Sequence, residues 1–167
     1  MVDFLLPKRL VDKAREVVDA NRAAGRRVAI AESCTGGLVS AALTEIPGSS
    51  DMFEAGFVTY SNAAKCSELG VSNEVVETFG AVSVATAWAM ARGALAACDA
   101  DVAVAITGIA GPGGGSPGKP VGTVVFARAE RDADPARIVA DQKFFEEESR
   151  AGVRLQATLC ALELLMP

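Results

Sequence analysis

The 167-residue sequence contains no histidine. This absence excludes Ser-His-Asp triads, Cys-His dyads and histidine-ligated metals together, because each of them needs an imidazole. Any proton transfer would have to use lysine, tyrosine, cysteine or a carboxylate. The four cysteines, at positions 34, 66, 98 and 160, form no C-x-x-C pair, so a structural zinc site is not expected.

The sequence also lacks an excess of basic residues and any long apolar run. Its net charge of −5 argues against a nucleic-acid partner, because binding to the phosphate backbone depends on clustered lysine and arginine. No segment approaches the roughly 18 to 20 apolar residues of a membrane span, and the N-terminus carries no export signal. We therefore expect a cytoplasmic protein with buried, unpaired thiols and with no nucleic-acid or membrane partner.

The size and composition indicate one globular domain over residues 1–167. Half of the residues are hydrophobic and 22% are charged, which suits a folded chain with a full core. Apolar spacing predicts helices near residues 8–24, 38–46, 62–69, 84–95 and 153–166. Short apolar runs predict strands near residues 27–31, 52–60, 102–106, 121–129 and 137–144. Helices and strands alternate early but the last strands follow one another, so we expect a mixed, mostly parallel sheet in a three-layer α/β/α sandwich.

The segment from Ala31 to Gly37 spans a predicted strand-to-helix turn. Alternation along a strand places Ser33 on one face and its two neighbours on the other. Thr35 is placed to cap the helix, and Gly36 and Gly37 would let a ligand approach N–H groups at the positive end of the helix dipole. This arrangement predicts an anion or oxyanion site, although a tight turn with a capped helix explains the same residues.

Three predicted strands end in polar residues, namely Ser33, Tyr60 and Thr107. Ligands bind outside the carboxyl ends of strands in open α/β sheets, so we expect these residues to share a pocket. A serine nucleophile needs a base, and Lys65, which follows the strand ending at Tyr60, is the best placed of the five lysines. At an unperturbed pKa only about one lysine in 2,500 is neutral at pH 7, so burial or a nearby cation would have to lower it. A solvated charge on a helix is the alternative explanation of Lys65.

The glycine-rich stretch from Thr107 to Gly118 contains partial matches to two nucleotide motifs. Gly113, Gly115 and Gly118 fit G-x-G-x-x-G, and Gly118-Lys119 fits the end of a Walker A motif. Both fail on context, because Pro120 follows the lysine and the next pattern is a strand. We interpret the stretch around Gly111 as a loop that closes the pocket near Thr107, with an inert surface linker as the alternative.

Four separated blocks resemble the CinA C-terminal domain family, in its stand-alone form. The blocks are Ala31-Glu32-Ser33-Cys34-Thr35-Gly36-Gly37, Gly56-Phe57-Val58-Thr59-Tyr60-Ser61-Asn62 with Lys65, Gly80-Ala81-Val82-Ser83, and Thr107-Gly108-Ile109-Ala110-Gly111-Pro112 with Lys119-Pro120-Val121-Gly122-Thr123-Val124. The resemblance runs from the first predicted helix to the last. The larger N-terminal domain of longer relatives has no counterpart in this sequence, so activities that depend on it are not implied.

The resemblance implies an amidohydrolase that converts nicotinamide mononucleotide to nicotinate mononucleotide and ammonia in pyridine nucleotide recycling. The family name also refers to competence and DNA damage. By resemblance Ser33 is the nucleophile, Lys65 its base and Tyr60 a pocket partner. The implied substrate site comprises Thr35, Gly36, Thr107, Gly108 and Arg150, to which our own interpretation adds Gly37 and Gly111. The sequence departs from the family at Glu148-Ser149, where relatives commonly have Gly-Asp before the arginine.

The expected mechanism is acyl transfer to Ser33, with Lys65 as base and N–H groups of the Thr35-Gly36 turn stabilising the oxyanion. It needs no metal and no organic cofactor, and its partner is a small-molecule nucleotide. One alternative is cysteine catalysis by Cys34 with Glu32 and Lys65. Another is a non-catalytic nucleotide-binding or partner-binding module, and a homodimer is possible in either case.

Overall fold

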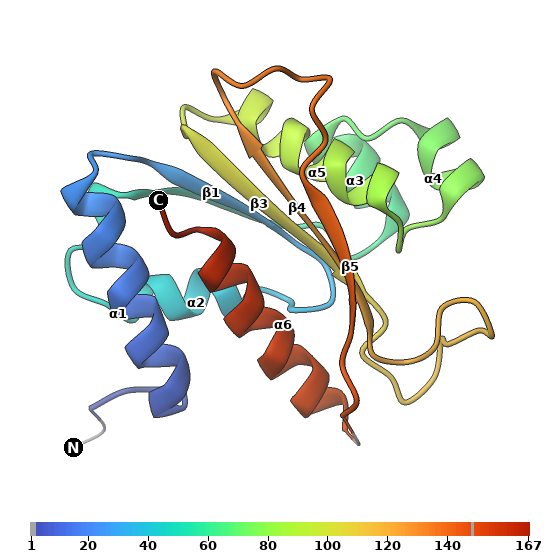
Figure 1. The fold of residues 1–167 in the computed structure, drawn as a ribbon, viewed down its shortest axis with the longest axis horizontal. Coiled ribbons are helices and arrows are strands. Elements are labelled where there is room, and N and C mark those ends of the chain that lie inside the picture. Colours follow the sequence, from blue (N-terminus) through green and yellow to red (C-terminus); the bar gives the residue numbers. More distant parts are fainter. Residues whose placement is uncertain (1–2, 148) are drawn as a thin grey trace.

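The computed structural model describes residues 3–147 and 149–167, and its centre is one five-stranded sheet (Figure 1). The strands lie in the order β2-β1-β3-β4-β5, with bounds β1 Val28–Glu32, β2 Phe53–Val58, β3 Val102–Gly108, β4 Thr123–Glu130 and β5 Ala140–Phe144. β1 pairs in parallel with β2 and β3, whereas β4 is antiparallel to both β3 and β5. Only β4 therefore runs against the others, and the predicted mixed, mostly parallel sheet is confirmed.

Helices cover both faces of the sheet, which gives the predicted three-layer α/β/α sandwich (Figure 1). The helices on one face are α1 Lys8–Ala23, α2 Leu38–Thr44 and α6 Arg150–Leu164. Those on the other face are α3 Asn62–Leu69, α4 Asn73–Phe79 and α5 Val84–Ala97. Each face has its own apolar core, so β1 and β3 are buried along almost their whole length. Burial on both sides explains why these two strands are continuous apolar runs in the sequence.

Two serines cap the N-termini of helices, Ser61 for α3 and Ser83 for α5. The Ser61 hydroxyl accepts a hydrogen bond from Ala64 N at 3.0 Å, and the Ser83 hydroxyl accepts one from Thr86 N at 3.1 Å. Each satisfies an N–H group that the first turn of a helix leaves without a partner. The Ser61 cap also fixes where α3 begins, and hence where Lys65 lies.

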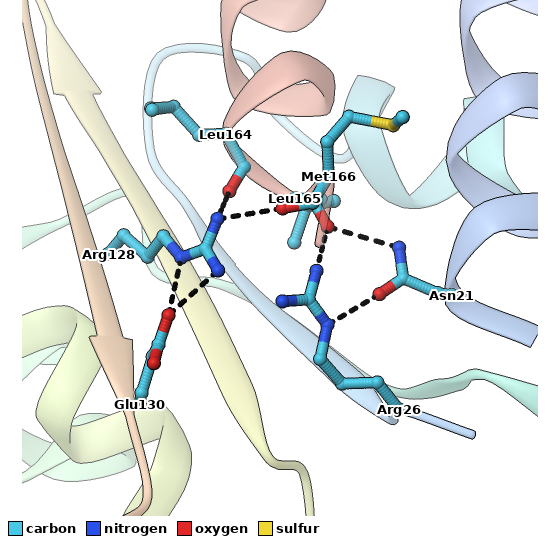
Figure 2. Close-up of polar contacts among 7 residues, drawn as sticks. All are labelled: Asn21, Arg26, Arg128, Glu130, Leu164, Leu165 and Met166. Atoms are coloured by element: carbon cyan, nitrogen blue, oxygen red, sulfur yellow. Dashed lines mark hydrogen bonds and ion pairs between the residues drawn. The ribbon is translucent and has the colours of Figure 1, made fainter. Parts of the chain in front are cut away.

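The C-terminal end of α6 is anchored by two arginines and an asparagine (Figure 2). Arg128 donates to two carbonyl oxygens of the last residues, at 2.9 and 2.8 Å, and also pairs with Glu130. Arg26 and Asn21 both donate to the carbonyl of Leu165. Cations at this end of a helix satisfy the last carbonyls and complement the helix dipole. The anchor holds α6 against the sheet, with its N-terminal end directed to the site described below.

Several predictions concern the chain as a whole. Within residues 3–147 and 149–167, no helix is long and apolar enough to cross a membrane. All four cysteines are free thiols, as expected, but Cys34 alone among them is buried and the other three are half-buried. The prediction of a single domain over residues 1–167 stays a prediction.

Candidate active site

A cavity of about 180 Å³ lies at the carboxyl ends of the parallel strands β1, β2 and β3. Six of the residues singled out in the sequence line this cavity: Ser33, Tyr60, Lys65, Thr107, Gly108 and Arg150. The polar residues at the three strand ends, Ser33, Tyr60 and Thr107, thus share one pocket, as expected for an open α/β sheet. Thr35, Gly36, Gly37 and Gly111 are not among the lining residues.

Ser33 and Lys65 are in direct contact. Lys65 Nζ lies 3.0 Å from Ser33 Oγ and donates to the carbonyl oxygens of Thr59 at 2.7 Å and Tyr60 at 3.4 Å. The lysine is 1% exposed, and this burial lowers its pKa from 10.5, opposed by the nearby thiols of Cys34 and Cys66. Lys65 is therefore not a solvated helix charge. It is a buried amine whose pKa is lowered, so that its neutral form is easier to reach than in water, and its nitrogen is in reach of a serine hydroxyl.

Cys34 also borders the cavity, but its thiol is poorly suited to catalysis. Burial raises the pKa of Cys34 to about 11 and keeps the thiol protonated. Its side chain packs in the core on the α6 side of the sheet, whereas Ser33 reaches Lys65 on the α3 side. Ser33 and Cys34, which follow β1, thus direct their side chains to opposite sides of the sheet, as alternation along an extended chain predicts.

The carboxylate of Glu32 caps the N-terminus of α2. This side chain is fully buried and accepts hydrogen bonds from the N–H groups of Gly37, Val39 and Ser40 at 3.0, 3.2 and 2.9 Å. The hydroxyls of Thr35 and Ser40 donate to it as well, at 2.6 and 2.9 Å. A buried carboxylate needs such partners, and the helix N-terminus supplies them.

Of the N–H groups expected to stabilise an oxyanion at the Thr35-Gly36 turn, that of Gly36 is therefore already bonded within the chain, and so is that of Gly37. Gly37 N–H is bound to Glu32, and Gly36 N–H donates to the carbonyl of Ser33 at 3.0 Å. Thr35 likewise donates to Glu32 instead of capping the helix by itself. Both glycines have positive φ, 60° and 97°, so their role is to let the chain turn sharply after Ser33.

Two N–H groups of the turn, those of Cys34 and Thr35, have no hydrogen-bond partner in another described residue. Arg154 of α6 holds this turn, because its Nε donates to the Cys34 carbonyl at 3.1 Å and its Nη2 to the Thr35 carbonyl at 3.2 Å. A peptide unit is planar, so fixing the Cys34 carbonyl also fixes the direction of the Thr35 N–H. The candidate oxyanion donors are therefore the N–H groups of Cys34, which borders the cavity, and of Thr35, which was already expected at this turn.

Arg150 connects two sides of the cavity. Its Nη2 donates to the Tyr60 hydroxyl at 2.9 Å and its Nη1 to the Gly111 carbonyl at 2.8 Å. Gly111 thus acts on the site through its contact with Arg150. Thr107 plays a similar part, because its hydroxyl donates to the carbonyl of Ala81 at 2.9 Å and so fixes another wall residue.

Glu32 and Arg154 were not predicted as site residues. A charged residue that ends an otherwise apolar strand, as Glu32 does, signals a buried carboxylate that needs several donors. Arg154 lies four residues after Arg150, and within α6 this spacing places both on one face. These signals identify the residues, but the partners of Arg154 lie more than a hundred residues away in the sequence.

Replacing Glu32 with glutamine tests its role as a cap. We expect a loss of about 3 kcal/mol in the free energy of unfolding, because charged hydrogen bonds are lost and an amide NH2 would face donors. Urea denaturation measures the change, with Glu77→Gln on the exposed surface of α4 as the matched control. A Glu32→Gln protein as stable as the control would contradict the assignment.

A larger cavity of about 530 Å³ lies between α1, β5 and α6. It is lined by charges of both signs, including Arg9, Lys13 and Glu163. Burial raises the pKa of its thiol, Cys160, and the cavity gathers none of the polar strand ends that surround Ser33 and Lys65. Among the residues that the structure describes, no three histidine, cysteine, aspartate or glutamate side chains gather as a metal site. The smaller cavity at the strand ends is therefore the candidate active site.

Comparisons with known proteins agree with this arrangement. Residues 11–167 match the model of the CinA C-terminal domain family. The chain is 50% identical to an Enterobacter agglomerans protein named nicotinamide-nucleotide amidohydrolase PncC, over 93% of each chain, and 48% identical to the Escherichia coli K12 protein of that name. It spans only a third of a Mycobacterium avium CinA-like protein to which it is 49% identical. The crystal structure of a competence/damage inducible protein from Agrobacterium tumefaciens superposes with a TM-score of 0.90 at 46% identity, over 96% of each chain. The chain belongs to the CinA C-terminal domain family.

Proposed function

We propose that this chain hydrolyses the carboxamide of nicotinamide mononucleotide to nicotinate mononucleotide and ammonia. The observation that carries the proposal is the contact of 3.0 Å between Ser33 Oγ and the buried Nζ of Lys65. Ser-Lys pairs perform acyl-transfer chemistry without histidine, which this sequence lacks. The relatives named as nicotinamide-nucleotide amidohydrolases, at about half identity over most of both chains, supply the substrate class.

The shape of the cavity is consistent with this substrate. At about 180 Å³ it is smaller than the roughly 300 Å³ at which ligand pockets begin, so only one end of a nucleotide fits inside. We place the carboxamide at Ser33 and the phosphate at the rim, beside Arg150. A guanidinium has five N–H donors, and the bonds of Arg150 to Tyr60 and Gly111 use two of them. The others can bind a phosphate.

The first half-reaction acylates Ser33. Neutral Lys65 takes the proton from Ser33 Oγ, which attacks the carboxamide carbon, and the carbonyl oxygen becomes an oxyanion. The N–H groups of Cys34 and Thr35 stabilise this charge from a turn that Arg154 holds in place. The lysine ammonium then returns its proton to the leaving nitrogen, ammonia departs, and an ester of Ser33 is left.

The second half-reaction hydrolyses this ester. Lys65 takes a proton from water, the resulting hydroxide attacks the ester carbon, and the proton passes to Ser33 Oγ as the carboxylic acid leaves. One amide and one water give one acid and one ammonia, with serine and lysine regenerated. No step requires a metal ion or an organic cofactor.

An ammonia-release assay tests the proposal. Purified protein with nicotinamide mononucleotide should produce ammonia and nicotinate mononucleotide in equal amounts, in the presence of a chelator. Calorimetric binding of the nucleotide with no ammonia release would favour a non-catalytic binding module instead. We further propose a cytoplasmic location, with the nucleotide as the small-molecule partner and a homodimer as the functional form.

The position assigned to Arg150 predicts a selective defect. Replacing Arg150 with alanine should raise KM for nicotinamide mononucleotide by about 10- to 100-fold, because charged hydrogen bonds to the phosphate are lost. Hydrolysis of nicotinamide, which has no phosphate, should change by much less. Steady-state kinetics on both substrates measures the difference, with Arg9→Ala on the exposed surface of α1 as the control. An equal loss on both substrates would place the phosphate elsewhere.

A further inference from the structure

β5 forms an open edge of the sheet (Figure 1). It is paired on one side only, with β4, and four of its five residues are exposed. At its two ends Arg128 N donates to the Val139 carbonyl and Phe145 N donates to the Gly122 carbonyl, both at 2.9 Å. The register between these bonds is unbroken, so the odd-numbered residues direct their N–H and C=O groups toward β4. Residues 140, 142 and 144 consequently direct theirs outward.

The side chains of β5 alternate between the two faces. Asp141 and Lys143 lie on the α6 side, where both border a small cavity beside Phe126 and Leu164. Ala140 packs against the α5 side, where Phe144, at the other end of the strand, is 54% exposed. The edge therefore carries one acid and one base on one face, and Gln142 between Ala140 and Phe144 on the other.

We propose that a second copy of this chain pairs antiparallel with this edge, about a two-fold axis at Gln142. In that register the outward groups of Gln142 pair with those of Gln142 of the partner subunit, and Ala140 pairs with Phe144 of the partner subunit. About six backbone hydrogen bonds form, two for each of three facing pairs. The two sheets become one continuous sheet, and the interface is isologous, as expected for a two-fold dimer.

The charges select this register over its neighbours. With the axis at Gln142, Asp141 faces Lys143 of the partner subunit, and the contact occurs twice. These are non-hydrogen-bonded pairs, in which side chains on facing strands lie closest together. Moving the axis by two residues, to Ala140 or Phe144, keeps the outward groups in phase but separates both charge pairs. One register thus satisfies the backbone and the charges together.

Apolar residues along the edge support the same pairing. Ile138 is 55% exposed and Val139 is 45% exposed next to β5, and Phe144 lies at its far end. An exposed apolar strand edge is a place where chains associate unless it is covered. The proposed dimer covers this edge. The edge lies at the opposite end of the sheet order from β2, and the dimer proposal does not depend on the proposed amidase activity.

Charge exchange between copies tests the register. Sedimentation of the wild-type chain should give a mass twice the 17.2 kDa of one chain. Asp141→Lys alone, or Lys143→Asp alone, turns two attractive contacts into two repulsive ones and should raise the dimer dissociation constant at least about tenfold. Mixing the two variants restores both attractive contacts, so the mixture should form heterodimers with wild-type affinity. Asp19→Lys, an equal charge change on the exposed face of α1, should leave the dimer unchanged.

A backbone variant tests the hydrogen bonds. Gln142→Pro removes an N–H group that makes no bond to β4, so the chain should fold, as judged by circular dichroism, and lose the dimer. A wild-type chain that sediments as a monomer would overturn the proposal. So would single charge variants that dimerise as well as Asp19→Lys, or a mixture of the two variants that stays monomeric.

Discussion

Replacing Ser33 with alanine should abolish ammonia release from nicotinamide mononucleotide, with a fall in kcat of about 10⁴-fold or more. Removal of a serine nucleophile costs this much in hydrolases whose acylation depends on it. The fold should survive, because the hydroxyl makes one side-chain contact, to Lys65. Steady-state kinetics measures the loss and thermal unfolding verifies the fold.

The neighbouring cysteine provides the matched control. Cys34→Ser should keep most of the activity, because the Cys34 thiol has its pKa raised to about 11 and packs in the core. An active Ser33→Ala protein combined with an inactive Cys34→Ser protein would assign the nucleophile to the cysteine.

Replacing Lys65 with methionine should remove the base and keep the shape of the buried side chain. We expect activity to fall at least about 10³-fold, because general-base catalysis contributes up to about 10⁴-fold. In the wild type, activity should rise with pH and level off above the pKa of Lys65. Burial lowers this pKa from 10.5, so the plateau should begin below that pH. A pH profile that rises without a plateau up to 10.5 would contradict the role of Lys65.

The same variant has an expected effect on stability. The folded pKa of Lys65 lies below its unfolded value, so the unfolded chain binds more protons between the two values and the free energy of unfolding rises with pH there. Below the folded pKa the buried lysine is charged and costs stability. Lys65→Met should therefore be more stable than the wild type at neutral pH, and the difference should shrink as pH approaches 10.5. Urea denaturation across this range measures it, with Lys8→Met on the exposed surface as the control.

Much of the site could be predicted from local patterns. Ser33, Tyr60 and Thr107 follow or end parallel strands, and parallel strands bring their carboxyl ends to one edge. The serine cap at position 61 fixes the start of α3 and so turns Lys65 toward that edge. The lack of histidine then leaves the lysine as the base. These steps use only strand alternation, capping and composition.

The environment of the turn could not be predicted in this way. Glu32 binds the start of α2 within eight residues, but whether a strand-end carboxylate faces a helix or a ligand depends on how the sheet is covered. Arg154 reaches the turn from α6, more than a hundred residues away in the sequence. The sequence pattern also missed α4, which has only seven residues and so is too short to show a repeating apolar spacing.

Identification of the acylated residue tests the central claim most directly. Wild-type protein is mixed with nicotinamide mononucleotide, quenched in acid within the first turnover and digested for peptide mass spectrometry. A Ser33 nucleophile activated by Lys65 predicts the acyl group of nicotinate mononucleotide as an ester on Ser33, and none on Cys34. An acyl group on Cys34, or ammonia formed in the first turnover with no acylated peptide at any quench time, would contradict it.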